Sequence, residues 1–261
     1  YHLLEYVQLW DVSCQKIIQI KGPDASHFLS LISCRDLSNA EPGKCYYTPM
    51  TNAKGGLLND TLVLCIEKDC YWVSLSDSDI FMWVTGILTN LSLKVFIEEK
   101  EVYTLAIQGP NSNALLREIT GNEIDKLSFF SFKDFKIKNK NFLISRTGFS
   151  KQGGYELYIK NPNSGRWLWD LIIQEGFKFN LKVGTVNLIE RVESGLLSYG
   201  NDMTIKDTPF DCSLGKYCSL ESDYNFIGKK ALLTQSKRGP FRDIYKVYFE
   251  APPNLDSFDV S

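Results

Sequence analysis

The chain of 261 residues contains only two histidines, His2 and His27. Hydrolytic triads and many zinc sites depend on histidine, so neither a histidine-based triad nor a multi-histidine metal site is expected. A G-x-G-x-x-G motif after a strand and a G-x-x-x-x-G-K-[ST] motif are both missing, so dinucleotide and P-loop nucleotide binding have no support. If the chain is an enzyme, we expect it to work without a catalytic histidine and without a metal.

Other absences narrow the class of protein further. No apolar run reaches the roughly 18 residues that a membrane-spanning helix needs. The net charge of −2 with mixed signs gives no general attraction to nucleic acid or to an anionic membrane. The seven cysteines include no C-x-x-C pair, so we expect reduced thiols in the cytoplasm and neither a disulfide framework nor a zinc site.

The chain repeats itself weakly. Residues 17–33 and 103–120 each read as a β-rich run, a Gly-Pro pair and a helix with apolar residues near helical spacing. Each half continues with a Gly-Gly pair, strands and a second helix. This pattern predicts an α+β fold made of a duplicated β-α-β-β-α unit, with Asp60 and Glu156 at related positions and a ligand cleft between the halves.

The domain boundaries follow from this pattern. We expect a duplicated domain over 1–238, with halves of roughly 1–100 and 101–185 followed by a C-terminal helix and loop segment, and the start of a truncated further domain over 239–261. Within the C-terminal segment, 185–200 reads as a helix ended by Gly200, and 226–235 reads as a short helix.

A carboxylate follows each Gly-Gly pair. Alternation along a strand puts Asp60 on one face with Leu58 and Leu62, where a charge is costly unless it is paired or used. The alternative is an ordinary aspartate at a strand start. Asp60 is therefore a candidate functional residue.

Glu156 shares its strand face with Tyr158 and Lys160, which is typical of a solvated face. The alternative is a ligand site, because a carboxylate accepts two parallel hydrogen bonds from a planar N–C–N donor pair. Arginine offers such a pair, and so does the aminopyrimidine edge of a pterin. Tyr158 would then supply a wall or a hydroxyl group.

Trp10 and the pair Glu190 and Glu193 each have a structural and a functional interpretation. Most tryptophans pack in cores, but Trp10 precedes Asp11 near a strand start, and a tryptophan face can hold a ligand cation. Glu190 and Glu193 lie on adjacent turns of the expected helix, and a solvated or salt-bridged face is the simpler interpretation for both.

Ordered segments along the chain resemble the glycine-cleavage T-protein superfamily of tetrahydrofolate-dependent one-carbon transferases. The resemblance covers nearly the whole chain, and its segments are LWDVSCQKIIQIKGPDASHFL, PGKCYYTPMTNAKGGLLND, AIQGPNSNALL, RTGFSKQGGYELY, ESGLLSYGNDM, SLGKYC and FIGKKALL. T-proteins have His-Met where this chain has Cys14 and Gln15, and an arginine where it has Asn187. These departures resemble the branch that demethylates dimethylsulfoniopropionate.

The resemblance implies transfer of a methyl group from dimethylsulfoniopropionate to the N5 nitrogen of tetrahydrofolate, giving methylmercaptopropionate. The alternatives are aminomethyl transfer in glycine cleavage and folate binding without catalysis. A small-molecule substrate, no nucleic acid or membrane partner and a homodimer are also expected. The family's C-terminal β-barrel domain is expected to be largely missing from this chain, with 239–261 as its start. The implied site residues are Asp60 as catalytic residue, Glu156, Tyr47, Tyr158 and Arg146 for the folate, and Trp10 and Lys16 for the substrate, with Lys16 or Arg146 meeting its carboxylate.

Overall fold

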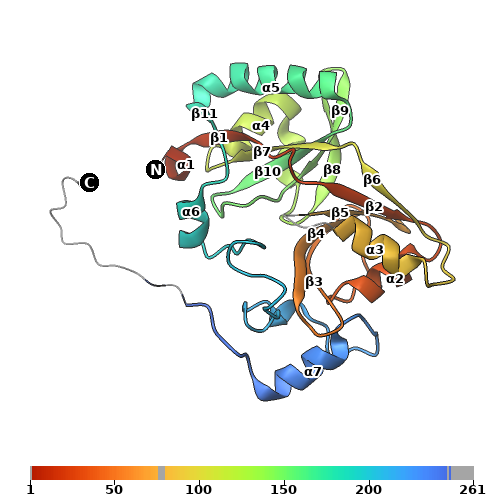
Figure 1. The fold of residues 1–261 in the computed structure, drawn as a ribbon. Helices are drawn as coiled ribbons and strands as arrows, with labels where there is room; N and C mark the ends of the chain where they lie inside the picture. The colour runs from red at the N-terminus through yellow and green to blue at the C-terminus, as the bar shows by residue number, and fades with distance from the viewer. Residues whose placement is uncertain (1, 76–79, 246, 248–261) are drawn as a thin grey trace.

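Two β-sheets pack face to face, and helices cover the outer face of each sheet (Figure 1). The computed structural model describes residues 2–75, 80–245 and 247. Residues 248–261, where most of the further domain was expected, lie outside the described residues, as do 1, 76–79 and 246. In the described part of the chain, no helix is long and apolar enough to cross a membrane.

The first sheet has the strand order β3-β4-β5-β2-β6, and its neighbouring strands are all antiparallel. Its strands are β2 (Ile17–Lys21), β3 (Cys45–Thr51), β4 (Leu57–Glu67), β5 (Cys70–Ser74) and β6 (Phe96–Lys100). Helices α2 (Ala25–Ile32) and α3 (Ile80–Leu88) pack on it through a core of buried aliphatic and aromatic side chains.

The second sheet has the order β11-β1-β7-β10-β9-β8, in which only β1 and β11 run parallel. Its strands are β1 (Val7–Asp11), β7 (Tyr103–Gln108), β8 (Phe132–Ile137), β9 (Lys140–Ser145), β10 (Gly154–Ile159) and β11 (Leu181–Gly184). Helices α4 (Ser112–Thr120) and α5 (Pro162–Gly176) cover its outer face. Short helical pieces are α1 (His2–Glu5), η1 (Asn122–Lys126) and η2 (Phe177–Phe179).

The same kind of close backbone contact explains the glycine of both Gly-Pro pairs. Gly22 follows β2 with φ +139°, and a Cβ there would lie 2.3 Å from the Lys94 carbonyl oxygen. Gly109 follows β7 with φ +119°, and a Cβ there would lie 2.3 Å from the Tyr6 carbonyl oxygen. In each half the chain passes a neighbouring backbone so closely that only glycine fits.

The predicted duplication is confirmed, and each unit has two strands more than expected, one after its first helix and one after its second helix. The first half runs β2-α2-β3-β4-β5-α3-β6, and the second runs β7-α4-β8-β9-β10-α5-β11. In the first half the extra strands are β3 and β6, and Pro49 in β3 argues against a strand. Because β3 lies at the edge of its sheet, the missing N–H of Pro49 is tolerated.

This topology corrects one expectation about the two acids. Strand β4 matches β9 in the duplicated order, and β5 matches β10. Asp60 on β4 and Glu156 on β10 are therefore not at related positions. They come from different strands of the repeated unit.

Side chains from both sheets form the interface between them. The buried members of this interface cluster are Ile17, Cys45, Leu64, Trp72, Val102, Phe132, Leu143 and Tyr158. The rings of Trp72 and Tyr158 meet edge to face at 6.3 Å. The backbone N–H of Cys45 also donates to the Phe130 carbonyl at 2.9 Å, so the two sheets are joined at one edge as well.

The C-terminal segment crosses from the second sheet to the first and contains α6 (Leu188–Glu193), η3 (Gly215–Tyr217) and α7 (Lys229–Arg238). The helix expected over 185–200 is wrong in length. The Asn187 side chain caps the start of α6 by accepting from the N–H groups of Ile189 and Glu190, and Gly195 has a φ of +66° just after the helix ends. Gly200 lies in a turn beyond the helix.

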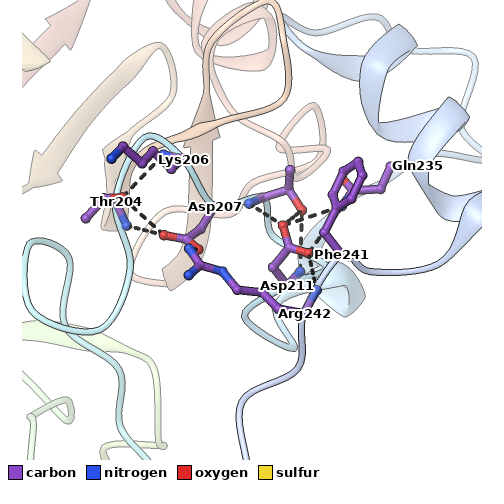
Figure 2. Close-up of polar contacts among 8 residues, drawn as sticks. Thr204, Lys206, Asp207, Asp211, Gln235, Phe241 and Arg242 are labelled. Carbon is purple, nitrogen blue, oxygen red and sulfur yellow. Dashed lines mark hydrogen bonds and ion pairs between the residues drawn. The ribbon is translucent and has the colours of Figure 1, made fainter.

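Two carboxylates fasten this segment where α7 ends (Figure 2). The Asp211 carboxylate accepts from the Thr208 N–H at 2.9 Å and hydroxyl at 2.7 Å, and from the Phe241 N–H at 2.7 Å. Burial opposes ionisation of Asp211, but these hydrogen bonds outweigh it and lower its pKa. Asp207 forms an ion pair with Arg242.

We predict that Asp211→Ala lowers the free energy of unfolding by about 2–4 kcal/mol, because several buried donors lose one charged acceptor. Since the pKa of Asp211 is lowered in the folded state, its contribution is present at neutral pH and is lost as the pH falls through that pKa. Urea unfolding at neutral and acidic pH measures both effects. The matched control is Asp243→Ala, an exposed aspartate, with a change within about 0.5 kcal/mol. Equal losses in the two variants would contradict the assignment.

Candidate functional site

A cavity of about 340 Å³ lies where β4, β10, α6 and the loops after β1 and β9 come together. Its polar and charged lining includes Gln15, Tyr47, Asp60, Thr147, Glu156, Arg191, Ser198 and Asn201. Two more open hollows are larger, about 820 Å³ beside α7 and about 470 Å³ beside β3. Among the described residues, neither of these hollows is lined by a buried carboxylate, so the smaller cavity is the better candidate site.

Asp60 lies on β4 and faces the cavity. The Tyr47 hydroxyl, on the adjacent strand β3, donates to Asp60 Oδ2 at 2.9 Å. Burial raises the pKa of Tyr47, and so does the charge of Asp60. Tyr47 therefore stays protonated at neutral pH and fixes the orientation of the Asp60 carboxylate.

Glu156 lies on β10 and is only 9% exposed, so the solvated-face interpretation is wrong. Its Oε2 accepts from the Thr147 hydroxyl and lies 3.5 Å from the Tyr158 hydroxyl. Ser145 Oγ is 2.5 Å from Thr147 Oγ1 and is the donor there, because the Thr147 proton points to Glu156. A chain of hydroxyl groups thus holds one oxygen of a carboxylate that lines the cavity.

Burial dominates the electrostatics of Glu156. Loss of solvent raises its pKa above the ordinary value of 4.5, while the hydrogen bonds from Thr147 and then Tyr158 oppose this rise. The charged form is costly at this position. A ligand that donates hydrogen bonds to the carboxylate would lower that cost.

The glycine pairs near these acids serve close packing. A Cβ on Gly56 would lie 2.2 Å from the Ile205 carbonyl oxygen, so this glycine lets the C-terminal segment approach β4. A Cβ on Gly154 would lie 2.4 Å from Gln108 Nε2. The Ser150 hydroxyl donates to Gln108 Oε1 at 2.8 Å, which fastens the loop that carries Thr147.

The other predicted site residues lie elsewhere. Tyr158 is 2% exposed and belongs to the interface cluster, where it contacts Glu156 from behind. Trp10 is 1% exposed, and its indole N–H donates to Gln8 Oε1 at 2.9 Å. Lys16 forms an exposed ion pair with Glu99 at 3.2 Å, and Arg146 donates to the Leu127 carbonyl at 3.0 Å. Of the seven predicted residues, the cavity lining contains Tyr47, Asp60 and Glu156.

Sequence reasoning missed two residues of the site, Thr147 and Arg191. Thr147 has no distinguishing pattern, because its role depends on the turn between β9 and β10. Arg191 lies between Glu190 and Glu193 in the sequence, on a helix whose face was expected to be solvated or salt-bridged. Glu190 is in fact 6% exposed and accepts hydrogen bonds from the side chains of Gln152 at 3.1 Å and Ser194 at 2.7 Å.

Within the ranges 2–75, 80–245 and 247, no group of three or more His, Cys, Asp or Glu side chains is arranged to hold a metal ion. The side chains that line the cavity include two carboxylates, hydroxyl groups and one arginine. Such a lining can orient a small polar ligand and take up a proton.

The comparisons with known proteins agree with this picture. The family model described as GCVT N-terminal domain matches residues 2–222, and the chain belongs to that family. It is a family of enzymes that transfer one-carbon groups.

Individual relatives show how far the match extends. The chain is 41% identical over 259 residues to dimethylsulfoniopropionate demethylase DmdA of Ruegeria pomeroyi, covering 98% of this chain and 71% of the relative. It is 35% identical over 237 residues to an aminomethyltransferase of Caldanaerobacter subterraneus, covering 88% of this chain and 63% of the relative. The solved aminomethyltransferase T of the glycine cleavage system from Bartonella henselae superposes with a TM-score of 0.78 at 24% identity, over 92% of this chain and 65% of that one, which supports the fold.

We predict that the stability difference between Glu156→Gln and the wild type depends on pH. Because the folded pKa of Glu156 is raised, the wild type loses stability relative to the variant as the pH rises through that pKa. Urea unfolding at pH about 4.5 and about 7.5 measures the difference, with Glu101→Gln on the exposed surface as control. A difference that is the same at both pH values would contradict the raised pKa.

Proposed function

We propose that the protein is a tetrahydrofolate-dependent methyltransferase that moves a methyl group from dimethylsulfoniopropionate to the folate N5 nitrogen. The observation that carries the proposal is the buried Glu156 carboxylate, which lines the same cavity as Asp60. The sequence identity of 41% to DmdA, over 98% of the chain, favours this methyl donor.

The cavity fits the pterin end of a folate. A pterin presents a ring N–H and an amino group in the planar N–C–N arrangement that a carboxylate accepts with two parallel hydrogen bonds. Glu156 supplies that carboxylate, and its burial makes the two hydrogen bonds strong. Apolar side chains that line the cavity, such as Leu62, Phe130 and Phe149, would cover the ring faces.

Tetrahydrofolate, when bound, supplies the nitrogen that forms a bond to the methyl carbon as the carbon–sulfur bond breaks, the electron pair leaves on a neutral thioether and the nitrogen releases its proton. A sulfonium needs no general acid, because its sulfur departs as a neutral thioether. The protein therefore needs to align the reactants and exclude water. Asp60, held by Tyr47, would orient the reacting nitrogen and accept its proton.

The chain spans 71% of the DmdA relative and 63% of the aminomethyltransferase relative. The activity of the whole protein is therefore part of the proposal. Aminomethyl transfer is the second candidate, because several relatives of 31–35% identity carry the name aminomethyltransferase. Residues 239–261 as the start of a barrel domain, the homodimer and the cytoplasmic location stay predictions, as do folate or substrate roles for Tyr158, Arg146, Trp10 and Lys16.

Product analysis separates these functions. The protein is incubated with tetrahydrofolate and either dimethylsulfoniopropionate or an aminomethylated lipoyl carrier, and the folate products are identified by mass spectrometry. We expect 5-methyltetrahydrofolate and methylmercaptopropionate from the sulfonium. Turnover of the lipoyl carrier alone would favour aminomethyl transfer. Folate binding without either product would favour a binding protein.

We predict that Glu156→Gln weakens tetrahydrofolate binding by about 1.5–3 kcal/mol, a factor of about 10–150 in Kd, because the charged acceptor of the pterin donor pair is lost. Titration calorimetry measures the change. The control is Glu101→Gln, an exposed glutamate outside the cavity lining. An unchanged Kd for Glu156→Gln would contradict the proposed pterin contact.

A further inference from the structure

Arg191 is the one cationic side chain that lines the cavity among the residues the structure describes. It lies on α6 and is 6% exposed, so its charge is removed from bulk solvent. The other charged side chains of the lining are Asp60 and Glu156. A buried arginine is energetically costly unless its N–H donors form hydrogen bonds or ion pairs.

Among the described residues, the Arg191 guanidinium forms its polar contacts through Nη1 alone. Its Nη1 donates to the Leu196 carbonyl at 3.1 Å and forms an ion pair with Asp202 Oδ2. Its Nε is buried and has no hydrogen-bond partner among the described residues. Nε and Nη2 form one edge of the planar group, and such an edge binds a carboxylate with two parallel hydrogen bonds.

The residues around Arg191 suit a small anion. Ser198 and Asn201 also line the cavity, and the Asn201 amide donates to Ser198 Oγ at 3.1 Å. The Ser198 N–H donates to Asp202 Oδ2 at 2.7 Å, so the carboxylate that holds Arg191 also holds this loop. The Nε–Nη2 edge is therefore positioned by contacts on the opposite side of the guanidinium.

We propose that Arg191 binds the carboxylate of the methyl donor and selects donors that carry both an onium cation and a carboxylate. This inference rests on the proposed function and names the residue that determines donor specificity. Lys16 and Arg146, which the sequence suggested for the substrate carboxylate, have other partners. Lys16 pairs with Glu99, and Arg146 donates to the Leu127 carbonyl. With its carboxylate on Arg191, a zwitterionic donor would direct its onium group away from that cation and toward the two acids of the cavity.

The first test leaves the protein unchanged. Titration calorimetry compares dimethylsulfoniopropionate with its carboxamide, in the presence of tetrahydrofolate. We expect the acid to bind about 10- to 100-fold more tightly, because the amide lacks the charged acceptor. Equal affinities for the acid and the amide would overturn the inference.

The second test removes the donor edge. Arg191→Gln is expected to reduce the preference for the acid to within about threefold, whereas Arg191→Lys keeps the charge and an intermediate preference. Arg166→Gln on the exposed surface of α5 is the control and keeps the full preference. If Arg191→Gln fails to fold, the wild-type comparison of acid and amide decides the question.

A third probe separates this inference from the proposed function. Methylmercaptopropionate carries the carboxylate without the sulfonium. If neither sulfonium compound binds but this carboxylate binds the wild type and not Arg191→Gln, the donor proposal fails and the Arg191 site stands. If tetrahydrofolate and the sulfonium bind but the acid and its carboxamide have equal affinities, the proposed function stands and the Arg191 inference fails.

Discussion

The face-to-face packing of the two sheets is the constraint on which the rest of the structure depends. Trp72 of the first sheet and Tyr158 of the second meet inside the interface cluster, and Glu156 lies two residues along the strand from Tyr158. This packing removes Glu156 from solvent while leaving it at the cavity. Because burial of a carboxylate is unfavourable, the hydroxyl groups of Thr147 and Tyr158 are needed to hold it there.

The cavity combines opposite charges for different purposes. Asp60 and Glu156 come from different strands of the duplicated unit, and α6 adds Arg191 from the segment that follows the two halves. In the proposed function, Glu156 binds the pterin edge, Asp60 faces the reacting nitrogen and Arg191 selects the donor. A duplicated fold can thus form an asymmetric site, because each half contributes a different strand.

Much of the fold could be predicted from the sequence, because local patterns specify it. The Gly-Pro repeat gave the duplication, and glycine is required at Gly22 and Gly109 by close backbone contacts. Strand β3 was missed because Pro49 suits only a sheet edge, and edge position is a tertiary property. Alternation placed Glu156 on a solvated face, yet the first sheet packs against that face. Thr147 and Arg191 were missed because their roles arise from loops and packing.

The central claim is direct contact between the Glu156 carboxylate and the N–C–N donor edge of the pterin. A thermodynamic cycle tests it: Kd values of tetrahydrofolate and its 2-desamino analogue are measured for the wild type and for Glu156→Gln. We expect coupling of about 1–2 kcal/mol between the two changes, because each removes one side of the same hydrogen bond. Additive effects of the two changes would contradict it.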